Sequence, residues 1–412
     1  MTTGEPVNGP GGRGPPWLPR PPAFPAASGD NPAMRIDVFS ASVGAGHVRA
    51  AQAVELALRA TLPTADIRNT DVLTLTNAAF RRVYGTTYLD LVNHAPHLLG
   101  YMYDMLDKPS TSGKARMDRL RRLVEKFNLA AFIKEVKGRR GTPGPDLVVN
   151  THFLSAGIIA GLRRKRRLAV PQVTVVTDFD AHRLWVNEPT ERYFVATEDA
   201  AATLGGWDVD RERITITGIP IHPVFAEPKA RAAACERLGL AGDRPIVLQL
   251  AGGFGVGPIE AIHQAVLAVP TPLEVVVVAG KNAEAKKKVE SLPCPKAHRR
   301  TVLGFTDRMD ELLAAADLVV SKPGGLTTSE TLARGAVMVI VDPIPGQEAR
   351  NSDYLLENGV AIKANSLAVL PGKIERLLAD PKRLATMKAR SKSLGHPDAA
   401  FAVAKAVAAM VG

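Results

Sequence analysis

Cysteine is scarce in this 412-residue sequence, which contains only Cys235 and Cys294. Two thiols this far apart provide neither a disulfide framework nor the ligand spacing of a metal site. We therefore expect each to be an unpaired thiol in a reducing compartment. The sequence also lacks an apolar run of membrane-spanning length, so any membrane contact is expected to be peripheral.

Acidic residues are outnumbered, because 52 Lys and Arg stand against 41 Asp and Glu, which gives a net charge of +11. This balance favours a polyanionic partner: a nucleic acid, an anionic bilayer surface or a phosphorylated substrate. A hydrophobic content of 46% indicates a globular fold, and 412 residues are too many for one ordinary core. Residues 1–33 are rich in proline and glycine and lack the apolar stretch of a secretory signal, so we expect a disordered leader.

Apolar runs that alternate with helical patterns predict a parallel α/β architecture in two halves. The first half has predicted strands at residues 36–40, 147–150, 173–177, 193–196 and 214–217. The second half has predicted strands at 246–250, 275–279, 302–305, 318–321 and 337–341, followed by predicted helices at about 366–378 and 398–411. The proline-rich residues 218–223 mark a boundary. We expect one domain over residues 34–219, a second over 220–395 and a C-terminal helix within 396–412.

His47 follows a glycine turn, residues 42–46, that joins the first predicted strand to a helix expected at residues 48–60. Strand, glycine turn and helix form the first unit of a doubly wound sheet, but the third glycine of a dinucleotide fingerprint is missing. A helix dipole disfavours imidazolium at the N-terminus. A neutral His47 there would suit the role of general base. The alternative is a capping or packing histidine.

Asp178 directly follows the predicted strand at residues 173–177, and His182 and Trp185 come shortly after it. A carboxylate at the carboxyl end of a parallel strand points into the crevice where ligands bind. Asp178 is therefore a candidate to orient His47 or to share the role of base. It would serve equally as a structural cap.

A glycine-rich loop in the second half is the first candidate for binding phosphate. It exposes backbone amides before a helix that starts near Pro258, and its glycines are Gly252, Gly253, Gly255 and Gly257. It lacks the Lys-Ser/Thr ending of a nucleoside-triphosphatase loop. No Asp-x-Asp motif stands in a position suited to a bound metal. We expect the loop and the helix N-terminus to stabilise a diphosphate without one.

A second loop, residues 322–325, separates the strand at 318–321 from another helix, for which we expect N-caps among Thr327, Thr328 and Ser329. Glu330 is expected in or near the first turn of that helix. The strand at 337–341 then ends in a proline-glycine segment that delivers polar side chains suited to hydroxyl groups, namely Gln347, Glu348 and Asn351. The alternative is an ordinary strand, loop and helix with a polar loop.

Aromatic and basic residues are concentrated between residues 76 and 140, with apolar and aromatic side chains at 84–106 and cations at 114–140. Five consecutive cations follow at 163–167. Basic residues beside aromatic ones suit an anionic lipid surface. The alternative is a helical insertion with solvated charges, and we favour it for most residues of 76–140. For residues 163–167 we give the two interpretations equal weight.

These motifs resemble, in order and in spacing, those of the monogalactosyldiacylglycerol synthase and processive diacylglycerol glucosyltransferase family, over roughly residues 35–395. Thr177-Asp178-Phe179 with His182 and Trp185 matches the family motif T-D-[FYL]-x-x-H-x-x-W. Residues 42–47 read Ser-Val-Gly-Ala-Gly-His where relatives usually read Asp-Thr-Gly-Gly-Gly-His, so the Asp of that motif is absent. The family consists of GT-B glycosyltransferases related to the lipid II N-acetylglucosaminyltransferase. The resemblance implies two Rossmann-like domains whose parallel sheets face a central cleft.

The same resemblance implies roles for particular residues. His47 would be the catalytic base, with Asp178 as a possible assistant, and the acceptor would contact Gly46, His182 and Trp185. The donor would lie on the glycine loop at 252–257 and on Gly324, Gly325, Leu326 and Thr327. Glu330 would hold the ribose, Phe305 the uracil, and Gln347 and Glu348 the sugar. The last helix would cross back to the first domain.

The activity that this resemblance implies is inverting transfer of a hexose, galactose or glucose, from a UDP-sugar to diacylglycerol or to a glycosyl-diacylglycerol. The expected partners are the UDP-sugar, the lipid acceptor and an anionic membrane surface, with no nucleic acid, no metal and no further cofactor. The implied location is cytoplasmic, at the inner face of the cell membrane. The alternatives are an isomerase of the UDP-N-acetylglucosamine 2-epimerase type and a non-catalytic nucleotide-sugar-binding protein.

Overall fold

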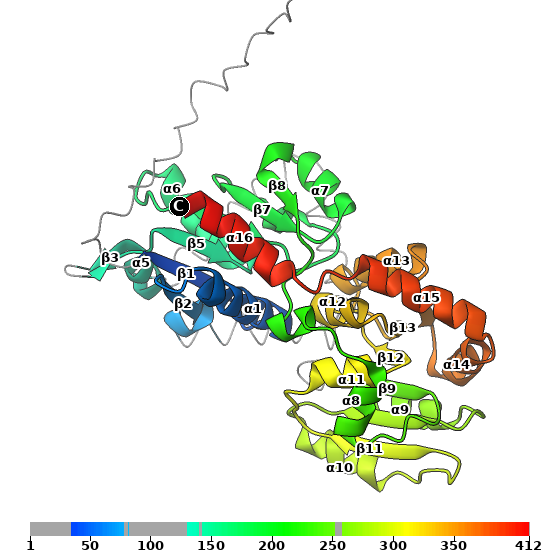
Figure 1. Cartoon of the computed structure of the whole chain (residues 1–412). Helices are drawn as coiled ribbons and strands as arrows, with labels where there is room; N and C mark the ends of the chain where they lie inside the picture. The colour runs from blue at the N-terminus through cyan, green and yellow to red at the C-terminus, as the bar shows by residue number, and fades with distance from the viewer. Residues whose placement is uncertain (1–33, 78–80, 82–129, 140–141, 252–257, 412) are drawn as a thin grey trace, which may run out of the picture.

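A computed structural model describes residues 34–77, 81, 130–139, 142–251 and 258–411 (Figure 1). Three of the predicted features lie outside these residues: the leader, most of the aromatic and basic region at 76–140, and the glycine loop at 252–257.

The first sheet has six parallel strands in the order β2-β1-β5-β6-β7-β8. Their bounds are β1 Arg35–Ser40, β2 Asp66–Asp71, β5 Leu147–Asn150, β6 Gln172–Val175, β7 Arg192–Val195 and β8 Ile214–Ile216. The chain passes from β1 to β2 on one side and then to β5 on the other. This reversal creates a switch point between β1 and β5, where doubly wound sheets bind ligands at the carboxyl ends of the strands.

The second sheet also has six parallel strands, in the order β11-β10-β9-β12-β13-β14. Their bounds are β9 Ile246–Leu250, β10 Glu274–Val278, β11 Arg299–Leu303, β12 Leu318–Ser321, β13 Val337–Val341 and β14 Ala361–Ala364. Here the switch point falls between β9 and β12. The two sheets confirm the predicted α/β architecture. A short antiparallel pair, β3 Gly138–Arg139 and β4 Thr142–Pro143, lies apart from both.

Helices flank both sheets, and Figure 1 shows the first sheet above and the second below. The helices of the first half are α1 Ala45–Thr61, α5 Ala130–Lys137, α6 Phe153–Arg164 and α7 Glu198–Gly205. Those of the second half are α8 Arg231–Leu238, α9 Ile259–Leu267, α10 Ala283–Ser291, α11 Met309–Ala315, α12 Gly325–Arg334, α13 Gln347–Glu357, α14 Leu370–Leu378 and α15 Pro381–Leu394. Short 3-10 helices include η2 Arg183–Trp185 and η4 Pro223–Ala226.

The C-terminal helix α16, Ala399–Val411, returns to the first sheet and packs on α1 (Figure 1). Val403 and Val407 of α16 are fully buried in one apolar cluster with Val38 of β1 and Val54 of α1. Because α15 belongs to the second half, this crossing ties the two halves together at the end of the chain.

Several predicted boundaries differ from the structure. The strand predicted at 302–305 is β11 at Arg299–Leu303, which leaves Phe305 in the loop that follows it. The helix expected from residue 327 onward is α12, which begins at Gly325. The prediction was wrong because Gly324 itself serves as the N-cap, with no side chain involved. Thr327, Thr328 and Ser329 therefore lie inside the helix, and Glu330 falls in its second turn.

Candidate active site

His47 is the third residue of α1, and its imidazole meets the residues that follow β5 and β6. Nδ1 lies 3.1 Å from the carbonyl oxygen of Thr151 and 2.8 Å from the hydroxyl of Thr177. A carbonyl oxygen can only accept, so Nδ1 carries the proton and donates it. This tautomer leaves the lone pair on Nε2, the nitrogen that can act as a base.

Burial lowers the pKa of His47 to about 4, although its hydrogen bond to Thr151 acts in the opposite direction. The ring stands edge-on to that of His152, with centroids 4.6 Å apart. His152 is buried too, and burial holds its pKa well below the usual range. At neutral pH both rings are therefore uncharged. An uncharged imidazole is the form that can receive a proton.

Sequence reasoning did not single out Thr151 or His152, and it named Thr177 only as the first residue of the motif Thr177-Asp178-Phe179. His152 caps α6, because its Nδ1 accepts a hydrogen bond of 3.0 Å from the backbone of Leu154. The available signal was the position of Thr151 and His152 directly after one predicted strand and of Thr177 at the end of another, at the sheet edge where ligands bind. The contact to Thr151 uses a backbone carbonyl, which no residue type reveals.

Asp178 contacts Trp185 and Gln347, whereas the recorded bonds of His47 Nδ1 go to Thr151 and Thr177. The Oδ2 of Asp178 accepts hydrogen bonds of 3.0 Å from the indole of Trp185 and 3.2 Å from Nε2 of Gln347. Burial raises the pKa of Asp178 to about 7, and the bond from Trp185 opposes that rise. Thr151 and Thr177 therefore orient His47, which is a role that the sequence suggested for Asp178. Trp185 is fully buried and acts as a support for the carboxyl group.

Gln347, expected to face the donor sugar, reaches across to the residues expected on the acceptor side. Its Nε2 lies 2.8 Å from Nε2 of His182 as well as 3.2 Å from Asp178. Burial lowers the pKa of His182 to about 3, so its ring is neutral and accepts the amide proton of Gln347. Since both amide protons of Gln347 point at these two residues, its carbonyl oxygen is the group left for a ligand.

The two halves are in close contact at Gly325, the first residue of α12. A Cβ at this position would overlap with the carbonyl oxygen of Thr177 and lie 3.2 Å from Ile219. Beside it, a Cβ on Gly46 would lie 3.5 Å from Leu326. Glycine at position 325 therefore lets α12 lie against Thr177, whereas a Cβ on Gly46 would make only ordinary van der Waals contact with Leu326.

The N-terminus of α12 has no side-chain cap. Gly324, the N-cap residue, has no side chain that could cap the helix. The hydroxyls of Ser329 and Thr331 donate to the carbonyls of Gly325 and Thr327, so they do not reach the amides of the first turn. Helix α13 likewise begins after a glycine, Gly346, with no side-chain cap. Uncapped helix N-termini attract anions, because the amides and the helix dipole both favour negative charge.

Glu330, the expected ribose ligand, is a buried carboxylate with 2% of its surface exposed. It forms an ion pair with Arg49 of α1, which comes from the other half of the chain. Burial raises the pKa of Glu330 to about 7, although Arg49 lowers it. Sequence reasoning overlooked Arg49, because a single cation on a helix ordinarily faces solvent.

Glu348 and Asn351 of α13 are held by neighbouring backbone. The Oε2 of Glu348 accepts a hydrogen bond of 2.8 Å from the backbone of Ile344, and burial raises the pKa of Glu348 to about 7. The amide of Asn351 accepts from the backbone of Phe179 and donates to the carbonyl of Pro323, each at 3.0 Å. Asn351 therefore joins the two halves, and the hydroxyl-binding role first considered for it does not fit.

Phe305 is the most exposed large apolar side chain in the described part of the chain, with 74% of its surface exposed. The Nζ of Lys281 lies 5.8 Å from the centre of its ring. Both residues follow strands of the second sheet, β11 and β10, at the carboxyl edge. An open aromatic ring at this edge is suited to stacking on a base. The glycine loop at 252–257, expected to bind the donor diphosphate, lies outside the described residues.

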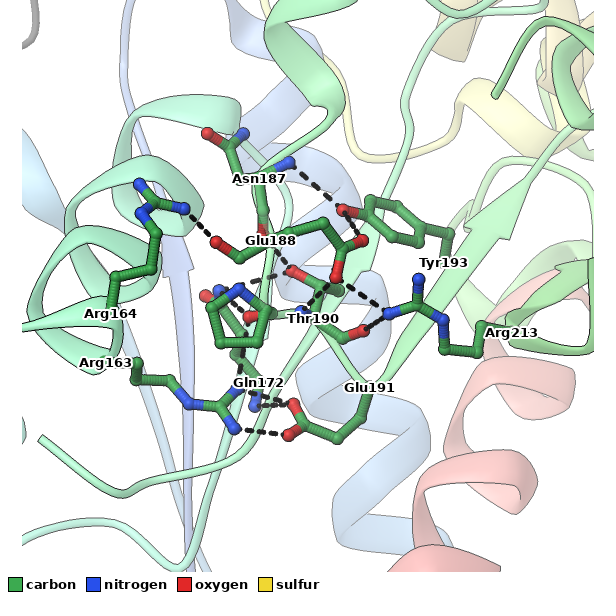
Figure 2. Close-up of polar contacts among 10 residues, drawn as sticks. Arg163, Arg164, Gln172, Asn187, Glu188, Thr190, Glu191, Tyr193 and Arg213 are labelled. Carbon is green, nitrogen blue, oxygen red and sulfur yellow. Dashed lines mark hydrogen bonds and ion pairs between the residues drawn. The ribbon is translucent and has the colours of Figure 1, made fainter. Parts of the chain in front are cut away.

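The basic run at 163–167 is only partly available to a partner. Figure 2 shows that Arg163 turns inward and pairs with Glu191 through two bonds of 2.8 and 2.5 Å. Arg164 donates to the carbonyl of Glu188, whose carboxylate in turn pairs with Arg213 at 2.8 Å. The exposed positions are residues 164–167.

Within the described part of the chain, no three or more His, Cys, Asp or Glu side chains are grouped as metal ligands would be. None of its helices combines the length and apolar character needed to cross a membrane.

Comparison with protein families gives two matches that together cover most of the described chain. The monogalactosyldiacylglycerol (MGDG) synthase family matches residues 47–221, and the C-terminal domain of glycosyltransferase family 28 matches residues 259–403. The first match begins at His47, and the second contains both Glu330 and Gln347.

Among curated proteins, the chain is 34% identical over 251 residues to a processive diacylglycerol beta-glucosyltransferase of Bacillus licheniformis, covering 61% of this chain and 65% of that one. It is 33% identical over 266 residues to the enzyme of the same name from Bacillus cereus, covering 64% and 68%. The chain thus spans about two thirds of the length of these relatives. Among solved structures, MurG of Acinetobacter baumannii shares the fold, with a TM-score of 0.59, 17% identity, and coverage of 92% of this chain and 100% of that one.

Proposed function

Because this chain belongs to the monogalactosyldiacylglycerol synthase and processive diacylglycerol glucosyltransferase family, we propose that it transfers a hexose from a UDP-sugar to diacylglycerol or to a glycosyl-diacylglycerol. The transferase names of the relatives favour this activity over the isomerase and the non-catalytic alternatives. We further propose that residues 34–219 bind the acceptor and residues 220–395 bind the donor.

The observation that carries the proposal is the link from His47 through Thr177 to Gly325. The hydroxyl of Thr177 bonds to Nδ1 of His47 and helps to hold the direction of the ring, and the carbonyl of Thr177 abuts the first residue of α12. A base with a lone pair on Nε2 thereby lies next to an uncapped helix N-terminus. These are the two groups that transfer from a nucleotide diphosphate needs: one for the acceptor proton and one for the leaving anion.

In the proposed reaction, Nε2 of His47 takes the proton of the acceptor hydroxyl as its oxygen attacks the anomeric carbon from the face opposite the diphosphate. The new carbon–oxygen bond inverts the anomeric centre. The electron pair of the old bond leaves with UDP, whose negative charge is stabilised by the N-terminus of α12. The low pKa of His47 would rise next to a bound diphosphate, because a nearby opposite charge favours the imidazolium form.

The supporting side chains have distinct proposed tasks. Glu330 would accept from the ribose, the open ring of Phe305 would contact uracil, and Gln347 with Glu348 would face the sugar. Asp178, through Gln347, would couple the position of the sugar to that of the acceptor. We propose that no metal takes part, since α12 supplies the charge that a cation would otherwise provide.

Work on a lipid acceptor requires access to a bilayer, so we propose that the protein binds peripherally at the inner face of the cell membrane. The exposed cations of residues 164–167 support attraction to an anionic surface.

The test is a panel of UDP-glucose, UDP-galactose and UDP-N-acetylglucosamine, with and without diacylglycerol in mixed micelles and with a chelator present. We expect UDP release and a glycolipid product, identified by mass spectrometry, only when diacylglycerol is added. His47→Ala should lower turnover at least about 100-fold while UDP affinity stays near the wild-type value. Turnover of donor without acceptor would support an epimerase instead.

A further inference from the structure

The ion pair between Arg49 and Glu330 joins the helix of the proposed base to the helix of the proposed donor site. Nη2 of Arg49 contacts Oε1 of Glu330, and these residues stand 281 positions apart in the sequence. The carboxylate is buried, with 2% of its side chain exposed, whereas 42% of the Arg49 side chain is exposed. A buried carboxylate thus has its counter-ion supplied by the opposite half of the molecule.

The charged surroundings of Glu330 leave Arg49 as its one favourable neighbour in the described part of the chain. The other charged group that affects the pKa of Glu330 is Asp310 of α11, whose negative charge raises that pKa. Asp310 is itself paired with Lys229 at 2.7 Å. The elements β13 and η4, which also pack on α12, carry no charged side chain. Glu348 of α13 lies beside Gly324 at the start of α12, and Lys392 of α15 lies beside Gly335 at its end.

The recorded bond uses only one oxygen of the carboxylate. In the part of the chain that the structure describes, no side chain or backbone amide is recorded as donating to Oε2 of Glu330. A hydroxyl that reaches Glu330 therefore finds an oxygen without a recorded protein donor, on a carboxylate whose position is already fixed by Arg49. An ionised carboxylate accepts hydrogen bonds about twice as strong as those of a neutral group.

We propose that Arg49 is a positioning residue for the nucleotide: it favours the ionised form of Glu330 and aims Oε2 at a ribose hydroxyl. This inference rests on the proposed function, since it requires a nucleoside diphosphate sugar at α12. It adds a task for α1, which would prepare the donor site from the opposite half of the chain as well as carry the base.

The charge of Glu330 gives the inference a distinctive consequence. Burial already raises the pKa of Glu330 to about 7 in the presence of Arg49. Removing the cation would raise that pKa further, so the carboxyl would be protonated at neutral pH and ionise only in more alkaline solution. Loss of Arg49 should consequently weaken donor binding at neutral pH and spare it at higher pH.

The experiment measures binding of UDP-glucose and UDP-galactose to the full chain by calorimetry between about pH 6 and about pH 8.5, where the diphosphate diester keeps its charge. The variants are Arg49→Met, Arg49→Lys and Glu330→Gln. We expect Arg49→Met to bind at least about fivefold more weakly at neutral pH and to recover toward wild-type affinity as pH rises, since raising a pKa of about 7 by one unit lowers the ionised fraction at pH 7 from about one half to about one tenth. Arg49→Lys should restore most of the affinity, and Glu330→Gln should bind weakly at every pH.

Three outcomes overturn the inference. The first is wild-type affinity in Arg49→Met across the range, and the second is the same loss at every pH, which is the signature of general structural damage. The third concerns Glu330→Gln. Wild-type binding together with an unaffected Glu330→Gln variant would remove Glu330 from the site, and the task of Arg49 with it. If the wild-type protein binds neither nucleotide sugar, the proposed function itself fails.

Discussion

The hydroxyl of Thr177 lies 2.8 Å from Nδ1 of His47, and this contact shares the imidazole proton with the carbonyl of Thr151. Thr177→Val would keep the shape of the side chain and remove the oxygen. The ring of His47 would then be held by Thr151 alone and would sample unproductive orientations. We expect kcat to fall about tenfold, equivalent to about 1.4 kcal/mol, with UDP affinity unchanged.

Thr174 of β6 offers a matched control for that substitution. It is fully buried, and its hydroxyl has no hydrogen-bond partner among the described residues. Thr174→Val should leave kcat at the wild-type level and keep or slightly increase thermal stability. Equal kinetic losses in the two variants would mean that the Thr177 hydroxyl has no specific role.

Gly325 allows the backbone of α12 to touch that of Thr177, so a single methyl group should separate them. In Gly325→Ala the new Cβ would overlap with a carbonyl oxygen, and one backbone would have to move. We expect a loss of about 2 kcal/mol or more in stability and a fall in both UDP affinity and kcat, because the donor helix and the base would no longer meet.

The control is Gly205→Ala at the end of α7, where a Cβ would find no heavy atom within 4 Å. This change should be neutral or stabilise the helix by up to about 1 kcal/mol. Differential scanning calorimetry compares the two variants. A Gly325→Ala protein as stable and active as Gly205→Ala would show that the contact at Thr177 is not needed.

The buried strands were predictable from sequence because parallel sheets covered on both faces need continuous apolar runs. Strands β5, β9, β12 and β13 accordingly have the predicted bounds. The edge strand β2 was missed, because Ile67 is its only buried residue and the rest of it is polar. Helix α15 was missed for a similar reason: it buries only Met387 and Ser391, so its apolar periodicity is weak.

The candidate site was predictable where a motif is local and was not where it depends on contacts across the fold. The glycine turn before His47 and the helix after Gly324 both follow from neighbouring residues. The partners of His47, by contrast, lie more than 100 positions away and include a backbone carbonyl. The pairing of Arg49 with Glu330 and the reach of Gln347 to Asp178 require two halves to meet, which sequence spacing cannot specify.

Asp178 should make stability depend on pH in a defined direction. Burial raises its pKa from 3.8 to about 7, so the folded state holds a proton between these values that the unfolded state has released. Stability supplied by this proton is present at acidic pH and is lost as pH rises toward about 7, with a slope of up to about 1.4 kcal/mol per pH unit.

Asp178→Asn removes this titration and leaves the other buried groups in place. Urea unfolding of both proteins should show that the wild type loses stability relative to Asp178→Asn as pH rises from about 5 to about 7. The difference isolates Asp178, because contributions from groups such as Glu348 cancel. A constant difference across this range would contradict a raised pKa for Asp178.

Arg166 and Arg167 should contribute to membrane attraction, while Arg163 should not. Both are exposed, whereas Arg163 is committed to Glu191 inside the fold. Each cation near an anionic surface contributes about 1 kcal/mol at most, and salt screens it. The double variant Arg166→Glu/Arg167→Glu should therefore float less with vesicles that contain phosphatidylglycerol, by about tenfold at low salt, and lose activity on those vesicles.

The control carries the same change of charge elsewhere: Lys287→Glu/Lys382→Glu, at two exposed positions of α10 and α15 in the second half. If attraction is local to residues 164–167, this control should float like the wild type, because a change in net charge alone would affect both variants equally. Activity on acceptor dispersed in neutral detergent should be equal in all three proteins. Equal loss of flotation in the two double variants would instead indicate a delocalised effect of the +11 net charge.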